Sequence, residues 1–69
     1  MSDSVYKVIE IVGTSKVSWE KAAVVAIERA SKSLRDLRVA EVVQQDLVME
    51  KGKVEAYRTK LKISFKFED

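Results

Sequence analysis

The spacing of apolar residues changes along the chain, and each spacing predicts one element. Residues 5–12 form a short run rich in valine, isoleucine and tyrosine, which is typical of a strand. Apolar side chains occur at both odd and even positions of this run, whereas a strand with one solvated face alternates more cleanly. We therefore expect both faces of the first strand to be covered, at least in part.

Residues 13–15 are expected to form a turn, after which the apolar spacing becomes helical. Ser18 is the predicted N-cap, because its hydroxyl can accept a hydrogen bond from a free amide of the first helical turn. The helix is predicted to end near Leu34. Its apolar residues recur at i, i+3, i+4 and i+7, and because most are alanine the helix can approach a sheet closely. They are Trp19, Ala22, Ala23, Ala26, Ile27, Ala30 and Leu34.

Residues 37–50 and 53–68 predict two long strands, joined by a tight hairpin at Lys51 and Gly52. Glycine at position 52 can take the positive φ that such a hairpin needs. In the second of these strands, apolar and polar residues alternate with a period of two. We expect its apolar row to cover the helix; this row is Tyr57, Thr59, Leu61, Ile63, Phe65 and Phe67.

The hairpin also predicts which residues of the two long strands lie opposite one another. Glu50 is expected opposite Lys53. Three pairs further from the turn share the face away from the helix, because strand side chains repeat every two residues; they are Gln45 with Arg58, Val43 with Lys60 and Glu41 with Lys62. The last pair has complementary charges, and a slip of one residue would invert the faces.

These elements predict an α+β fold of order β-α-β-β, with a three-stranded antiparallel sheet wrapped around one helix and a single domain over residues 1–69. A chain this short buries only about 60% of its unfolded surface, so small domains usually add disulfides, a structural metal or association. The chain has no cysteine and no histidine, which excludes disulfides and the common zinc ligands. Since long strands also expose long edges, we expect a homo-oligomer.

Charge and terminal sequence bear on the partners. Thirteen basic and eleven acidic residues give a net charge of +2, a balance that does not by itself suggest nucleic acid. The polar start of the chain is unlike a signal peptide, and no apolar run approaches the ~20 residues that cross a bilayer. We expect a cytoplasmic protein without a membrane partner. Because the chain lacks histidine for proton transfer near neutral pH and a cysteine nucleophile, we expect no enzyme and assign no catalytic residue.

Polar residues of the strands leave several kinds of site open. Gln45 and Arg58 could form a pocket for a phosphate or carboxylate. Alternatively, Arg58 could make a salt bridge between subunits or be a charge that lines a cavity. Residues 13–15 could bind phosphate ahead of the helix. A calcium or magnesium ion takes about six or more oxygen ligands, so only a site shared between subunits could gather enough acids; the candidates are Glu10, Glu41, Asp46 and Glu50.

Two further surfaces suggest macromolecular partners. A basic row on the last strand could face nucleic acid, but the aromatic side chains lie on the opposite face and Glu41 partly neutralises the row. We therefore expect no nucleic-acid partner. The outer face of the helix could instead serve as an adaptor for another protein. The basic row is Arg58, Lys60, Lys62 and Lys66.

Several segments together resemble the dodecin family over nearly the whole chain. They are residues 6–15, which end in Gly-Thr-Ser, Ser18 with the alanine-rich helix after it, residues 39–42 and the closing residues 62–66. The resemblance implies a β-α-β-β subunit that assembles into a hollow homo-dodecamer. It also implies binding and storage of a flavin, such as FMN or riboflavin, without a catalysed reaction.

The resemblance also points to Val39 and Arg58, which together with Gln45 are the candidate ligand-binding residues. In flavin-binding dodecins, paired flavin rings stack between tryptophans of the second strand, and that position falls on Val39. A glutamine of the third strand normally holds the edge of the flavin, and its position falls on Arg58. Valine offers no aromatic face, and stacking of this kind is worth about 1–3 kcal/mol per ring. We therefore expect weak flavin binding.

The chain is most similar to a branch of the family that lacks this tryptophan and includes calcium dodecins. This similarity implies calcium or magnesium binding, or a purely structural shell, as the alternative function. It identifies no metal-ligating residue. The only tryptophan of the chain, Trp19, is interpreted as a core residue of the helix rather than as a flavin-stacking residue.

Overall fold

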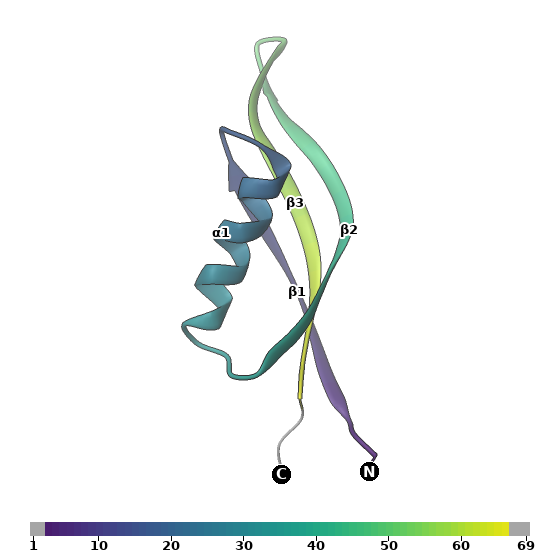
Figure 1. Cartoon of the computed structure of the whole chain (residues 1–69). Helices are drawn as coiled ribbons and strands as arrows, with labels where there is room; N and C mark the ends of the chain where they lie inside the picture. Colours follow the sequence, from purple (N-terminus) through teal and green to yellow (C-terminus); the bar gives the residue numbers. More distant parts are fainter. Residues whose placement is uncertain (1–2, 67–69) are drawn as a thin grey trace.

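A computed structural model describes residues 3–66 and confirms the predicted order of elements. Strand β1 (Tyr6–Ser15) is followed by helix α1 (Trp19–Ser31), and strands β2 (Leu37–Glu50) and β3 (Lys53–Lys66) form a hairpin. The sheet is antiparallel with the strand order β1-β3-β2, so β3 is central and the other two strands are edges. Helix α1 lies along one face of this elongated sheet (Figure 1). We call this face the helix side and the opposite face the far side.

Strand β1 is longer than predicted, and the expected turn at residues 13–15 is wrong. All three residues pair with β3, and Gly13 lies opposite Thr59. Gly13 is buried, and a Cβ atom there would overlap the carbonyl oxygen of Ala22 and lie 2.9 Å from the Cβ of Ala26. The glycine therefore permits a close approach of strand and helix, and the chain turns only after Ser15.

Helix α1 begins as predicted and ends earlier. The Ser18 hydroxyl accepts a hydrogen bond from the Lys21 amide at 3.0 Å, which confirms the N-cap. The helix ends at Ser31 rather than near Leu34, because the amides of Ser33 and Leu34 both bond to the carbonyl of Ala30 in a tightened last turn. In the described part of the chain, residues 3–66, no helix has the length and apolar character needed to span a membrane.

The core is small and lies between α1 and the helix side of the sheet. Its buried apolar residues are Ala22 and Ala26 from the helix and Leu61 and Ile63 from β3, as the two periodicities predicted. Ile9 and Ile11 of β1 pack against this core. The other face of β1 is not covered within one chain, since Val8 remains 55% exposed. Phe67, predicted for the same apolar row, lies outside the described residues.

The hairpin register departs from the prediction between two β-bulges. Glu50 pairs with Lys53 and Glu41 with Lys62, as predicted. Between these pairs Glu55 is an extra residue in β3 and Val43 an extra residue in β2, so the register shifts by one and then returns. The predicted pairs Gln45 with Arg58 and Val43 with Lys60 are therefore wrong. Arg58 instead lies opposite Asp46, and Lys60 lies opposite Gln44.

Candidate functional site

The two bulges determine which side chains lie next to Arg58 on the same face of the sheet. Gln45 lies opposite Thr59, whose hydroxyl donates to the carbonyl oxygen of Trp19 on the helix side. Residues directly opposite each other share a face, so Gln45 belongs to the helix side and Arg58 to the far side. The structure does not bring these two candidates together, and Gln44 and Asp46 accompany Arg58 instead.

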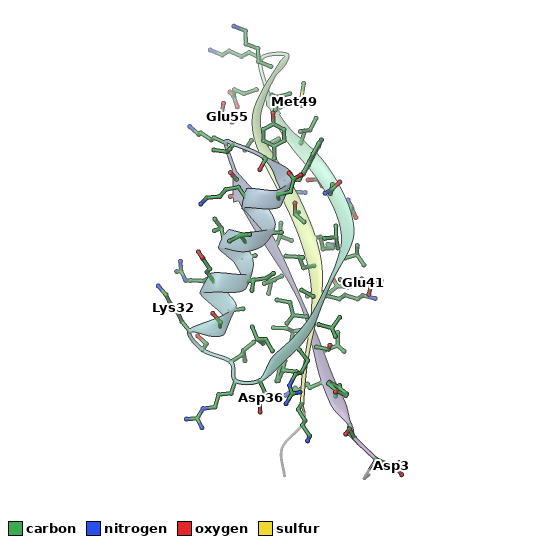
Figure 2. The ribbon with its side chains drawn as sticks, in the orientation of Figure 1. Asp3, Lys32, Asp36, Glu41, Met49 and Glu55 are labelled. Atoms are coloured by element: carbon green, nitrogen blue, oxygen red, sulfur yellow. The ribbon has the colours of Figure 1, made fainter. Side chains whose placement is uncertain are left out.

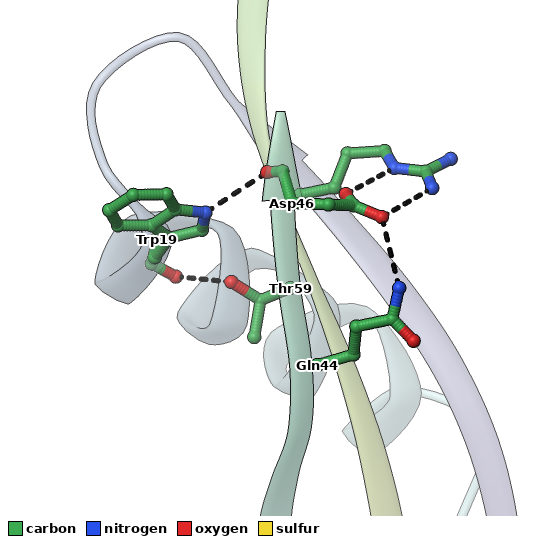
Figure 3. Close-up of polar contacts among 5 residues, drawn as sticks. Trp19, Gln44, Asp46 and Thr59 are labelled. Atoms are coloured by element: carbon green, nitrogen blue, oxygen red, sulfur yellow. Dashed lines mark hydrogen bonds and ion pairs between the residues drawn. The ribbon is translucent and has the colours of Figure 1, made fainter. Parts of the chain in front are cut away.

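A bidentate ion pair holds Arg58 on the far side of the sheet (Figure 3). Its Nε donates to Asp46 Oδ1 and its Nη2 donates to Asp46 Oδ2, both at 2.8 Å. Gln44 Nε2 donates to the same Oδ2 at 3.4 Å. The Arg58 hydrogen bond holds the pKa of the Asp46 carboxyl below its usual range, and Asp46 in turn raises the pKa of Arg58.

This pairing changes the chemistry that Arg58 can offer. The open interpretations are a pocket for an anion, a salt bridge between subunits and a charge that lines a cavity, and the observed salt bridge is within one chain. A phosphate or carboxylate ligand would have to compete with Asp46 for the planar fork of donors. The site is therefore better suited to a neutral polar ligand than to an anion.

Trp19 and its neighbours fix the strand segment that carries Asp46. The Trp19 indole Nε1 donates to the carbonyl oxygen of Asp46 at 3.0 Å, and its ring packs edge-on against Tyr57 with centroids 5.1 Å apart. The Thr59 hydroxyl donates to the carbonyl oxygen of Trp19 at 2.9 Å. Trp19 is thus partly buried on the helix side beside Tyr57, outside the core cluster of the described residues, and it anchors β2 from behind the ion pair.

Val39 lies far from this polar cluster. It is opposite Ser64 near the start of β2, and Val8 of β1 is opposite the same serine from the other edge. The two valines are 59% and 55% exposed, so this end of the far side is an open apolar patch. At about 3.3 Å per residue, Val39 and Asp46 are roughly 20 Å apart along the strand. One ligand could contact Val39 and Arg58 together only if different subunits supply them.

The acidic candidates do not form a metal site within one chain. Among residues 3–66 no group of three or more acidic side chains lies close enough to hold an ion. Glu10 and Glu41 are both opposite Lys62, one from each side. Residues 13–15 do not form the suggested phosphate site ahead of the helix, because they belong to β1 and do not begin the helix.

Sequence reasoning placed Asp46 among possible metal ligands and missed its pairing with Arg58. The available signal was the acidic residue directly beside Gln45, which a one-residue change of register brings opposite the arginine. Two bulges that compensate each other leave both ends of the predicted hairpin register intact, so the ends alone could not reveal the shift.

Comparisons with known proteins agree with this architecture. A family model for dodecin matches residues 5–68. The calcium dodecin of Mycobacterium tuberculosis is 52% identical over 63 residues, covering 91% of this chain and 89% of the relative. The dodecin of Thermus thermophilus is 37% identical over 65 residues, which are 94% of each chain.

Solved structures show the same fold. The dodecin from Streptomyces coelicolor is 39% identical and has a TM-score of 0.92, with 100% of this chain and 99% of that chain covered. The calcium dodecin of M. tuberculosis, a calcium-chelating protein with a calcium-binding site, has a TM-score of 0.84 at 51% identity, with 94% and 93% covered. Sequence, family model and fold agree over nearly the entire length, and the chain belongs to the dodecin family.

Proposed function

We propose that this protein is a cytoplasmic, non-enzymatic binding and storage protein whose single domain, residues 1–69, assembles into a hollow homo-dodecamer. The observation that carries the proposal is the poor coverage of its apolar surface. Among residues 3–66 only four apolar side chains are buried, while fourteen large apolar side chains are at least 36% exposed. Soluble proteins rarely leave such surface uncovered unless it is an interaction site. Family membership supports a closed shell of twelve subunits.

We place the ligand in a seam between subunits on the far side of the sheet. The apolar patch at Val39 and the polar cluster at Arg58 are the two surfaces available there, and the distance between them within one chain requires two subunits. We assign the polar contact to Arg58 with Gln44, because Gln45 belongs to the helix side. A flavin is the ligand that the family suggests, and its binding is weak because Val39 provides no aromatic face.

Titration of riboflavin and of FMN with the protein, followed by flavin fluorescence, tests this ligand. Weak quenching that saturates only at high protein concentration supports the proposal, and riboflavin should bind at least as well as FMN because Asp46 occupies Arg58. Unchanged fluorescence at tens of micromolar protein, confirmed by equilibrium dialysis, would remove flavin from the account.

The alternative is a calcium-binding or purely structural shell. It is favoured by the 52% identity to a protein named calcium dodecin and by acidic side chains on both edge strands, Glu10 and Glu41, which point to the far side. Such a site would combine carboxylates from neighbouring subunits. Calorimetric titration with calcium, and melting with and without a chelator, separate the two versions. A flat isotherm and an unchanged melting curve would defeat the metal version.

A further inference from the structure

The hairpin of β2 and β3 extends beyond the rest of the fold. Pairing between β1 and β3 ends at Ser15 and Tyr57, so residues 47–56 form a two-stranded arm with no third strand beside them. The arm projects past the first turn of α1 (Figure 1), and Figure 2 shows Met49 and Glu55 on it. A two-stranded hairpin without further support is only marginally stable in water.

The arm gathers its apolar side chains on one face. Leu47 lies opposite Tyr57, whose ring contacts Trp19, so Leu47 is on the helix side. Side chains alternate along β2, which puts Met49 on the same side, and Val54 lies opposite Met49. The three side chains are 40%, 54% and 49% exposed, because α1 begins at Trp19 and does not reach them. The arm therefore carries an apolar face that its own chain leaves uncovered.

A groove of about 500 Å³ lies on the same molecule between α1 and the edge strand β1. Its walls are mostly apolar, with Ile9 and Ile11 on the strand and Val25, Ala26 and Ala30 on the helix. Its volume is in the range of about 300–1,000 Å³ that is usual for occupied pockets. Arg29 is its only charged lining residue, and within residues 3–66 it makes no ion pair.

The arm cannot reach the groove of its own chain. Leu47 and Trp19 are at the same level of the molecule, because Tyr57 contacts both. From that level the arm runs outward, whereas α1 runs in the other direction (Figure 1). Val25 lies about 9 Å further along α1 than Trp19, at the helical rise per residue. Two further residues of strand add ~7 Å to the separation between Met49 and Val25. Only another molecule can bring an arm and this groove together.

We propose that the arm of one copy of this chain docks in the groove between α1 and β1 of a second copy. The apolar face of the arm matches the apolar walls, and Glu55, the bulge residue of the arm, supplies the negative charge that complements Arg29. Each copy has one arm and one groove, so two copies can exchange arms about a two-fold axis, or the contact can run head-to-tail and form a ring if the rotation closes. The inference rests on the proposed self-assembly and names the surfaces that achieve it.

Cross-linking of single-cysteine variants tests the contact directly, because the natural chain has no cysteine. Met49→Cys is mixed with Val25→Cys and treated with a short bis-maleimide, and cross-linked peptides are identified by mass spectrometry. In this mixture every arm-to-helix link joins two copies. Val24→Cys is the matched control, because Val24 is equally exposed but does not line the groove. We expect links to position 25 at least tenfold more abundant than links to position 24.

Mass measurements by light scattering test what the contact contributes. Val54→Asp should reduce the mass of the assembly, whereas Val17→Asp, the same change at an exposed loop valine, should leave it unchanged. Arg29→Glu and Glu55→Arg should each weaken the assembly, and the double exchange should restore it. Circular dichroism checks that each variant remains folded.

The outcomes separate this inference from the proposed shell. A wild-type protein that is a lone chain would overturn both. The arm contact alone would be overturned by two results together. The wild-type protein assembles and Val54→Asp leaves the mass of the assembly unchanged, and cross-links from position 49 are equally abundant to positions 25 and 24. Preferential links to position 25, together with loss of mass in Val54→Asp and recovery in the double exchange, would establish it.

Discussion

At the scale of single residues, Gly13 decides how closely the helix can approach the sheet. Any side chain at this position meets the carbonyl oxygen of Ala22 and the methyl group of Ala26, both in the rigid middle of the core. Gly13→Ala should therefore lower the free energy of unfolding by about 1–3 kcal/mol, the usual cost of overpacking. Urea denaturation followed by circular dichroism measures this change.

Gly52 provides the control for that prediction. It has a φ of +77° in the hairpin turn, and nothing lies within 4 Å of a Cβ placed there. Asparagine tolerates this backbone conformation, so Gly52→Asn should remain close to wild type. If Gly13→Ala were as stable as Gly52→Asn, the close approach of strand and helix would not limit this position.

The ion pair of Asp46 and Arg58 predicts a dependence of stability on pH. Pairing lowers the pKa of folded Asp46 below the unfolded value of about 3.9. The ionised carboxylate therefore stabilises the fold above about pH 4, and this contribution is lost as the pH falls through the lowered pKa. Asp46→Asn should be less stable than wild type at pH 7 and should converge with it near pH 2 in melting experiments.

The matched control for Asp46→Asn is Asp36→Asn. Asp36 contacts Arg38 only at 3.9 Å, and both side chains are substantially exposed. Exposed pairs with such loose geometry contribute little, so this variant should melt like wild type at both pH values. Equal losses in the two variants would mean that the bidentate geometry of Asp46 has no particular value.

A substitution of Val39 tests the proposed flavin site at the scale of a single residue. Val39→Trp adds an aromatic face to the far side, and one stacked ring is worth about 1–3 kcal/mol. Riboflavin should then bind about 5- to 150-fold more tightly, as measured by fluorescence quenching. Val42→Trp, three residues along the same strand, lies on the helix side opposite Leu61 and should have no such effect. Equal gains at both positions would contradict a flavin site in the far-side seam.

At the scale of elements, the sequence predicts the type of every element because its periodicities are strong. Ser18, the alanine stripe and the alternation of β3 place the helix over the central strand. The end of β1 and the register of the hairpin were mispredicted because they depend on tertiary contacts. Gly13 is typical of a turn when only its sequence neighbours are considered, and its role appears only with the helix above it. The bulges at Val43 and Glu55 shift the register between two ends of the hairpin that still match the prediction.

The candidate site was predictable only in part, for the same reason. The positions of Val39 and Arg58 follow from family resemblance, which aligns strands independently of their cross-strand partners. The residues next to Arg58 depend on the register of β2 and β3. One extra residue in a strand places Asp46 instead of Gln45 opposite Arg58. That exchange replaces a neutral neighbour of Arg58 with a charged one and so changes which ligands the candidate site could hold.

The start of α1 yields a prediction at this scale. Ser18 satisfies the Lys21 amide, which otherwise has no partner in the first turn. Ser18→Ala should lower the free energy of unfolding by about 0.5–2 kcal/mol, measured by urea denaturation. Ser18→Asp restores an acceptor and should recover most of the loss. A stable Ser18→Ala protein would show that tertiary packing alone holds the helix start.

At the scale of the whole molecule, one chain is 53 Å long and only 15 Å across its shortest axis. Such a shape gives little interior, and most of the large apolar side chains described remain exposed. Both edge strands also leave backbone donors and acceptors without a neighbouring strand. In the proposed shell, other copies of the chain cover these surfaces, and the proposed ligand site lies in the seams between them.

Multi-angle light scattering of the purified protein at low micromolar concentration tests this conclusion most directly. The account predicts a single species of about twelve times the 7.8 kDa of one chain, with no folded monomer on dilution. A well-folded, thermally stable protein that scatters as a single chain would contradict it.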